Sequence, residues 1–291
     1  MLVRPATPED AQAATDLLMA VDLAELGEVD YNLEALHDEW NELGFDLARD
    51  AVIVEDDAGT AIGYAHFRGN DVQVAVDPRR EGEGAGTALL AWTERRGRER
   101  GDKLLRQAVG DRGASARALL TANGYTPARS FWRMERDLQP GETADEDGLR
   151  ALQATDAPAL HSISEEAFAG DGAYTSQSLE TWTQREFRAH GFDQALGRVA
   201  VRDGRPVGFA LARRWEQDTV YVPLLAVLPE AAGKGLGGRL LQAVFAASAA
   251  AGLRRAQLNV AADNPNAVRL YERVGMSQRW RVDDYQKPLP D

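Results

Sequence analysis

Two glycine-rich loops of the same design occur in this chain, 151 residues apart, at Pro78 and at Pro229. The first loop runs to Gly86 and the second to Gly237, and a pair of leucines follows each. The same offset joins further residues downstream, which are Gly101 and Gly252, Ala116 and Ala267, Leu119 and Leu270, and Gly124 and Gly275. Chance does not preserve one register over such a stretch, so the sequence predicts an internal duplication.

Length and composition fit two ordinary domains. The 291 residues accommodate two halves of roughly 140 to 150 residues, which is a usual domain size. There is no cysteine, and the four histidines show no ligand spacing, so we expect neither disulfides nor a metal site. No apolar run has membrane-spanning length, and the N-terminus lacks a signal-peptide core, which together predict a cytoplasmic protein.

The formal net charge of −13 limits the partners of this chain. An acidic protein is repelled by nucleic acid phosphates and by anionic membranes, so we expect neither as a partner. The same charge would attract a cationic small molecule, and its simplest alternative role is solubility.

An acidic stretch with Pro140 and Gly141 lies where the duplication requires a linker. It predicts an N-terminal domain over residues 1–138, a linker over 139–147 and a C-terminal domain over 148–291. Each half has the same expected order of elements: a helix, a strand hairpin, a third strand, the glycine loop with its helix, and then strand, helix and strand. In the second half, the hairpin turn is Asp203-Gly204 and the third strand covers 219–228. The order indicates mixed α/β domains.

Glycine loops that bind phosphorylated ligands have distinct designs. A P-loop needs Gly-Lys-Ser/Thr, whereas Gly233-Lys234 is followed by another glycine. The dinucleotide fingerprint Gly-x-Gly-x-x-Gly is present at Gly233, Gly235 and Gly238. However, in dinucleotide-binding folds the first strand runs straight into the first glycine. Here three expected strands come first, and the other copy breaks the pattern at Thr87.

The order of motifs in the second half resembles that of the GCN5-related N-acetyltransferases. The matching pieces are Val227-Leu-Pro229, Gly233-Lys-Gly235-Leu-Gly237, Leu258-Asn259-Val260 and Asn264-x-x-Ala267-x-x-Leu270-Tyr271-x-x-x-Gly275. The duplication extends the resemblance to both halves. It implies two tandem acyl-CoA N-acyltransferase domains, each with flanking helices and a mixed, mostly antiparallel sheet that is splayed at its centre. The tandem plan also resembles that of the mycothiol synthases.

The resemblance implies acetyl-CoA (coenzyme A) as the cofactor. Backbone amides from Gly233 to Gly238 would surround its pyrophosphate, because glycine lets the backbone approach closely, and Lys234 or Arg239 could add charge. Backbone groups from Leu225 to Val227 would hold the pantetheine and polarise the thioester carbonyl. The expected cofactor-binding residues are Leu225, Ala226, Val227, Ala232, Gly233, Lys234, Gly235, Leu236, Gly237, Gly238, Asn259 and Asn264.

The resemblance also implies a catalytic residue. Tyr271 stands where the family's tyrosine protonates the departing thiolate, and the alternative is a half-buried packing tyrosine. Asn264 stands where the family's asparagine touches the cofactor, and it is also placed to cap a helix before Pro265. Ala232 replaces the family's usual Arg or Gln, which removes a side chain but leaves the backbone cradle.

The first copy has lost this polar apparatus. Glu81 and Glu83 put negative charge beside the first loop, and Gly113 and Leu120 stand where the second copy has Asn264 and Tyr271. We therefore expect the first domain to be degenerate, with a structural or substrate-shaping role.

The acceptor is expected to be a primary amine on a small molecule. An amino sugar, an aminoglycoside-like compound, a polyamine and a peptide N-terminus all remain open. The carboxylates that could deprotonate it are Glu216, Asp218, Glu165 and Glu166, each of which could equally be a solvated surface charge. The aromatic residues Trp182, Phe187 and Phe192 could line its pocket or belong to the core. The rival function is a non-catalytic acyl-CoA-binding or interaction protein on the same fold.

Overall fold

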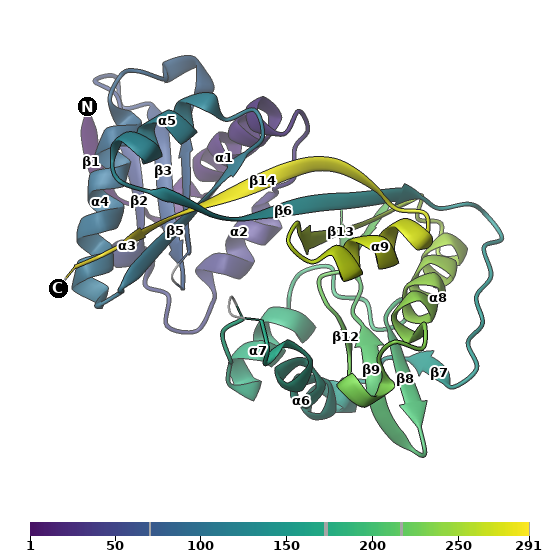
Figure 1. Ribbon diagram of the computed structural model, residues 1–291. Coiled ribbons are helices and arrows are strands. Elements are labelled where there is room, and N and C mark those ends of the chain that lie inside the picture. The colour runs from purple at the N-terminus through teal and green to yellow at the C-terminus, as the bar shows by residue number, and fades with distance from the viewer. Residues whose placement is uncertain (70, 172–173, 216–217, 291) are drawn as a thin grey trace. The chain divides into compact units, whose positions relative to one another are not determined.

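The computed structural model describes residues 1–69, 71–171, 174–215 and 218–290, and these form two compact units (Figure 1). The first unit comprises Met1–Phe131 and Trp280–Asp291, and the second comprises Trp132–Arg279. These units differ from the domains expected on either side of the linker, because each one takes a strand segment from the other half of the sequence.

The first unit is a mixed sheet with helices on both faces. Its strands lie in the order β1-β2-β3-β4-β5-β14-β6. Helix α1 packs on β3 and β4 from one side, and α4 packs on the same strands from the other. Its elements are β1 (Leu2–Pro5), α1 (Ala11–Glu25), α2 (Leu33–Trp40), α3 (Leu47–Asp50), β2 (Ala51–Glu55), β3 (Ala61–Arg68), β4 (Asp71–Val76), α4 (Ala85–Arg100), β5 (Leu104–Gly110), α5 (Ala114–Ala122) and parts of β6 (Thr126–Asp137) and β14 (Ser277–Pro288).

The second unit repeats this plan, but its strands fall into two groups. One group has the order β12-β9-β8-β7, and the other has the order β6-β13-β11-β10. Helix α6 packs against β9 and β12, and α8 packs against β8 and β9 (Figure 1). Its elements are β7 (Leu149–Ala151), α6 (Ala157–Phe168), α7 (Leu179–Phe187), β8 (Arg198–Arg202), β9 (Arg205–Ala210), β10 (Arg213–Trp215), β11 (Thr219–Tyr221), β12 (Leu225–Val227), α8 (Leu236–Ala250), β13 (Arg255–Ala261) and α9 (Pro265–Arg273).

The hairpin expected at Asp203-Gly204 is confirmed, since it joins the antiparallel strands β8 and β9. Both turn residues have positive φ, +50° and +76°. This backbone matches the tight turns whose twist suits a hairpin, and Asp and Gly are among the residues that adopt it at least cost.

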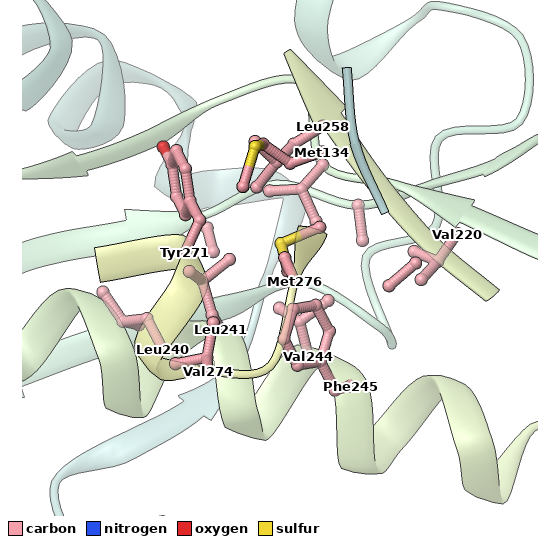
Figure 2. Packing of buried hydrophobic residues seen from close by; sticks show 14 of the residues in the cluster. Met134, Val220, Leu240, Leu241, Val244, Phe245, Leu258, Tyr271, Val274 and Met276 are labelled. Atoms are coloured by element: carbon pink, nitrogen blue, oxygen red, sulfur yellow. The ribbon is translucent and has the colours of Figure 1, made fainter. Parts of the chain in front are cut away.

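The core of the second unit forms where α8 meets the sheet (Figure 2). Leu240, Leu241, Val244 and Phe245 recur at helical spacing on α8 and are fully buried. Met134 of β6 is also fully buried and belongs to the same cluster. A residue that lies before the linker therefore completes the core of the unit that lies mostly after it.

The exchange is reciprocal, because the last strand of the chain completes the first unit. Residues Val282–Pro288 of β14 pair antiparallel with Leu104–Gly110 of β5. Tyr285 and Leu289 are buried in a core cluster of the first unit together with Leu105 and Tyr125.

We expect that residues 1–138 and 148–291, expressed separately, do not fold as stable halves. The first fragment lacks Tyr285 and Leu289, and the second lacks Met134, and removing one large core side chain costs about 2–5 kcal/mol. Total domain stability is only about 5–15 kcal/mol. Thermal melting by circular dichroism would measure this loss. Coexpression of both fragments is the control and should restore a cooperative transition. Cooperative melting of each fragment alone, near the transition of the full chain, would contradict the expectation.

Candidate active site

At the centre of the second unit, β12 and β13 belong to different sheets, and we call this break in strand pairing the opening. Strand β11 pairs parallel with β13, from Thr219 opposite Arg255 to Tyr221 opposite Gln257. The Val222 amide donates to the Gln257 carbonyl at 2.8 Å, and the next residue is Pro223, which has no N–H to continue the ladder. The single strand expected over 219–228 is therefore two strands, and the expected splay lies at their junction.

The opening leaves one edge of β12 without a strand partner in the part of the chain that the structure describes. The Leu224 carbonyl accepts from Leu211 at 2.9 Å, and the Leu228 amide donates to Val207 at 3.0 Å, so these even-numbered positions face β9. Since backbone groups alternate along a strand, the N–H and C=O of Leu225 and Val227 face the opening. Ala226 is buried and sits opposite Phe209 in the β9 register.

The second glycine loop lies between β12 and α8. Gly233 and Gly235 have φ of +76° and +80°, conformations that disfavour other residues, and Gly235 is the N-cap of α8. A Cβ at either glycine would meet no atom within 4 Å, so the space next to these two residues is open. The first helical bond runs from Arg239 N to Gly235 O, which leaves the amides of Leu236, Gly237 and Gly238 without helical acceptors. Such an array suits a pyrophosphate.

The later glycines of the loop serve packing. A Cβ at Gly237 would lie 3.2 Å from a Leu270 methyl group and 3.7 Å from one of Leu225, and a Cβ at Gly238 would lie 3.5 Å from Leu270. Their small size lets α8 approach α9 closely. These two glycines thus let α8, whose first amides lack helical acceptors, pack closely against α9.

Two cations stand near the loop. Lys234 is exposed, as are its neighbours Ala232 and Gly233. Arg239 is paired with the linker: its Nε lies 3.1 Å from Asp145, and its Nη2 donates to the Asp147 carbonyl oxygen at 2.5 Å.

Tyr271 projects from α9 at the edge of the core, with its hydroxyl directed away from Leu241 and Val274 (Figure 2). Burial raises the pKa of Tyr271 to about 12, and Tyr221 contributes in the same direction. The phenol is therefore protonated at neutral pH. The ring packs in the core cluster, which agrees with the alternative of a packing tyrosine, and the protonated phenol keeps a proton that it can donate.

Asn264 caps α9, since its Oδ1 accepts from the Ala267 amide at 3.1 Å and Pro265 follows at the first helical position. The expected capping role is thus present. Asn259 on β13 is exposed, between the buried residues Leu258 and Val260.

Of the four carboxylates expected as bases, two have other partners, one is exposed and one lies outside the described residues. Glu216 lies outside them. Asp218 forms an ion pair with Arg255 at 3.2 Å, before β11 begins. Glu165 accepts from the hydroxyls of Ser176 and Tyr174, which hold the pKa of its carboxyl below the usual value. Glu166 is exposed on α6.

The aromatic residues belong to a core cluster under α6 and α7. Trp182 is 2% exposed, and its ring centroid lies 5.5 Å from that of Phe187. Phe187 in turn lies 4.8 Å from Phe192, and both pack against the same cluster. Trp182 is therefore a core residue, as one of the two alternatives predicted, whereas Phe187 and Phe192 are partly buried and pack against that core.

A polar group on β6 and β13 lies close to the splay and was missed by sequence reasoning. Gln257 Nε2 donates to Glu135 at 2.6 Å, and Arg133 Nη1 donates to Gln257 Oε1 at 3.4 Å. The Arg133 guanidinium also lies 5.1 Å from the centre of the Tyr221 ring. The available signal was that Arg133 and Glu135 alternate with apolar residues along the strand, but nothing local placed that segment beside β13.

The corresponding place in the first unit holds a carboxylate of its own. The Gly110 amide donates to Glu25 at 2.8 Å, and a Cβ at Gly113 would lie 2.5 Å from the Glu25 carboxylate. Burial raises the pKa of the Glu25 carboxyl, and Glu81 adds to the rise. Gly84 keeps the N-cap geometry of its counterpart, with φ of +94°. The first copy has thus kept the backbone conformation of its glycine loop, while the Glu25 side chain occupies the space at the end of β5.

The described residues contain neither a membrane-spanning helix nor a metal-binding cluster. No helix there is long and apolar enough to cross a membrane. No cluster of three or more potential metal-ligating side chains was found in the same residues.

The model of the acetyltransferase (GNAT) family matches residues 18–125 and 157–276, one segment in each half. The chain therefore belongs to the acetyltransferase (GNAT) family. It is similar to the mycothiol acetyltransferase of Thermobispora bispora, with 34% identity over 241 residues that cover 78% of this chain and 80% of that protein.

Solved structures agree on the tandem fold. A GCN5-related N-acetyltransferase from Sphaerobacter thermophilus has a TM-score of 0.81 at 29% identity, covering 100% of this chain and 96% of that one. A tandem GNAT protein from the clavulanic acid biosynthesis pathway has a TM-score of 0.74 at 16% identity, covering 100% and 99% of the two chains. The expected fold class is confirmed, and by family the chain is an acyltransferase.

Proposed function

We propose that this chain transfers an acetyl group from acetyl-CoA to a primary amine of a small molecule, at one site in the second unit. The observation that carries the proposal is the free edge of β12 beside the open glycine loop. That edge offers the backbone groups of Leu225 and Val227, and the loop offers three amides at the start of α8. A thioester with a phosphorylated tail matches both.

Each residue of the site has a separate task in this proposal. The amides of Leu236, Gly237 and Gly238 bind the pyrophosphate, and the backbone of Leu225 and Val227 orients the pantetheine and the thioester carbonyl. Acetyl-CoA supplies an activated acyl group, which a neutral amine can attack directly. The Tyr271 hydroxyl donates a proton to the sulfur as the carbon–sulfur bond breaks.

The proposed acceptor rests on the names of similar proteins and on the net charge of this chain. Similar proteins carry the name mycothiol acetyltransferase, which supports an amine of the mycothiol system as the first acceptor to test. The net charge of −13 favours a cationic amine in solution, whose deprotonation must precede attack. The polar group of Glu135 and Gln257 beside the splay is a suitable place for hydrogen bonds to such an acceptor.

A panel assay tests the proposal. We expect thiol release from acetyl-CoA only when a suitable amine is present, with a mass increase of one acetyl group on that amine. The panel should hold mycothiol-type amines, amino sugars, polyamines and peptides. Calorimetric binding of acetyl-CoA without turnover on any amine would favour the rival, a non-catalytic acyl-CoA-binding protein. No binding at all would refute both.

A further inference from the structure

The linker reaches the helix that follows the second glycine loop. Arg239 lies one turn into α8, directly after the free amides of Leu236–Gly238. Its Nε lies 3.1 Å from the Asp145 carboxylate, and its Nη2 donates to the Asp147 carbonyl oxygen. All of these residues belong to the second unit. A linker carboxylate thus holds a cation beside the proposed phosphate cradle.

This ion pair is open to exchange. The side chain of Asp145 is 68% exposed and that of Arg239 is 33% exposed. Exposed ion pairs contribute little, because water screens both charges and both side chains lose freedom. A guanidinium binds phosphate through paired, charge-assisted hydrogen bonds, which are stronger. A phosphate that reaches the start of α8 can therefore take Arg239 from Asp145.

A second ion pair of the linker would remain in place after Asp145 releases Arg239. Glu146 lies 3.2 Å from Arg198, whose side chain is only 9% exposed. Arg198 also donates to three carbonyl groups of its own chain, those of Ala195, Leu196 and Gly197. Release of Asp145 therefore leaves the neighbouring linker residue in place, so the exchange needs no movement of the whole segment.

The duplication offers an internal comparison. At the offset of 151 residues, the first copy has Ala88 where the second has Arg239. The arginine is therefore a feature of the loop that we assign to the cofactor, and the fold itself does not require it. A structural cation would be needed in both copies.

We propose that Asp145 competes with the phosphate groups of the cofactor for Arg239, so that the linker sets the affinity of the second unit for acetyl-CoA. The inference rests on the proposed function, and it names the residue that binds phosphate and the residue that opposes binding. The ligand chemistry required is a phosphate group near the start of α8. Coenzyme A has two sources, its pyrophosphate and its 3′-phosphate.

Calorimetric titration with acetyl-CoA tests the proposal. We expect Asp145→Asn to lower the dissociation constant about two- to fivefold, the effect of one exposed charge, and Arg239→Gln to raise it. In the Arg239→Gln background, Asp145→Asn should have no further effect, because the competition acts through the arginine. The rise in affinity caused by Asp145→Asn should be smaller at about 0.5 M salt, because salt screens exposed charges. Dephospho-CoA distinguishes the sources, since loss of the Arg239 effect with this ligand assigns the contact to the 3′-phosphate.

Asp147→Asn is the matched control. It removes the same charge two residues away, and Asp147 contacts Arg239 only through its backbone carbonyl. Thermal melting of each ligand-free variant checks that the fold is kept. Three results would overturn the proposal. The dissociation constant could be unchanged in Asp145→Asn, the affinity could rise equally in Asp147→Asn, or the rise in affinity could persist in the Arg239→Gln background. If the wild-type chain binds no acetyl-CoA, the proposed function falls as well; if it binds but ignores Asp145, only this inference falls.

Discussion

Replacing Tyr271 by phenylalanine should lower the turnover number about 10²–10⁴-fold, the usual contribution of general acid catalysis. The dissociation constant of acetyl-CoA should change little, because the hydroxyl is needed only when charge develops on the departing sulfur. The ring stays in place in the variant, since it packs in the core with Leu241 and Val274. Steady-state kinetics with the best amine, together with calorimetric binding, separate the two effects.

The pKa of Tyr271 gives this prediction a pH dependence. An acid must be protonated to act, and a pKa of about 12 keeps the phenol protonated far above neutral pH. Any loss of activity above about pH 9 in the wild type must therefore have another cause than deprotonation of Tyr271. The activity of the variant should show the same acidic limb, which reports deprotonation of the amine or its base.

Tyr125→Phe is a suitable control for the tyrosine variant. Tyr125 is buried in the first unit, and burial raises its pKa to about 12 as well, but its hydroxyl bonds to Gln107. This change should leave turnover near the wild-type value. A turnover number of Tyr271→Phe within about threefold of wild type, with chemistry shown to limit the rate, would assign Tyr271 to packing alone.

Gly235→Glu should abolish measurable acetyl-CoA binding, with an affinity loss greater than about 100-fold. The residue needs φ of +80°, which costs a non-glycine side chain about 1–2 kcal/mol. The new carboxylate would also stand beside the free amides of α8, where it would repel phosphate and compete for the same donors. Calorimetric titration of the variant with acetyl-CoA measures the effect.

The duplication supplies a matched control at Gly84→Glu. Gly84 is the N-cap of α4 with φ of +94°, so the backbone strain is comparable. If only the second loop binds the cofactor, Gly84→Glu should lower the melting temperature about as much as Gly235→Glu does. It should leave acetyl-CoA binding intact. Loss of binding in this variant, or two equivalent sites in the wild-type titration, would show that the first loop also binds the cofactor.

Local sequence patterns predicted much of the fold. The repeat of the glycine loops predicted two similar units, and Asp203-Gly204 predicted the hairpin between β8 and β9. Both rest on residues whose backbone preferences act within a few positions, such as glycine at positive φ. The order of motifs predicted the family, and it placed Gly235 at the start of a helix and Tyr271 on the next one.

Local sequence patterns did not predict which segments far apart in the sequence pack together in the fold. The segment 126–137 reads as a strand, yet nothing in it specifies that Met134 completes a core formed mainly by residues after the linker. The linker itself reads as solvated acidic chain, although Asp145 pairs with Arg239. The expected strand over 219–228 also changes partner within its length, because Pro223 ends one ladder and Leu225 begins another.

The shared strands have a consequence for synthesis of the protein on the ribosome. Strand β5 finds its neighbour β14 only when the chain has grown from Gly110 to Val282, which are 172 positions apart. At about 5–20 residues per second, that takes roughly ten to thirty seconds. During this interval the edge of β5 has unpaired backbone groups that another chain could match. The first half of the sequence emerges first but matures last, so a chaperone that shields nascent edges should raise the yield of this protein.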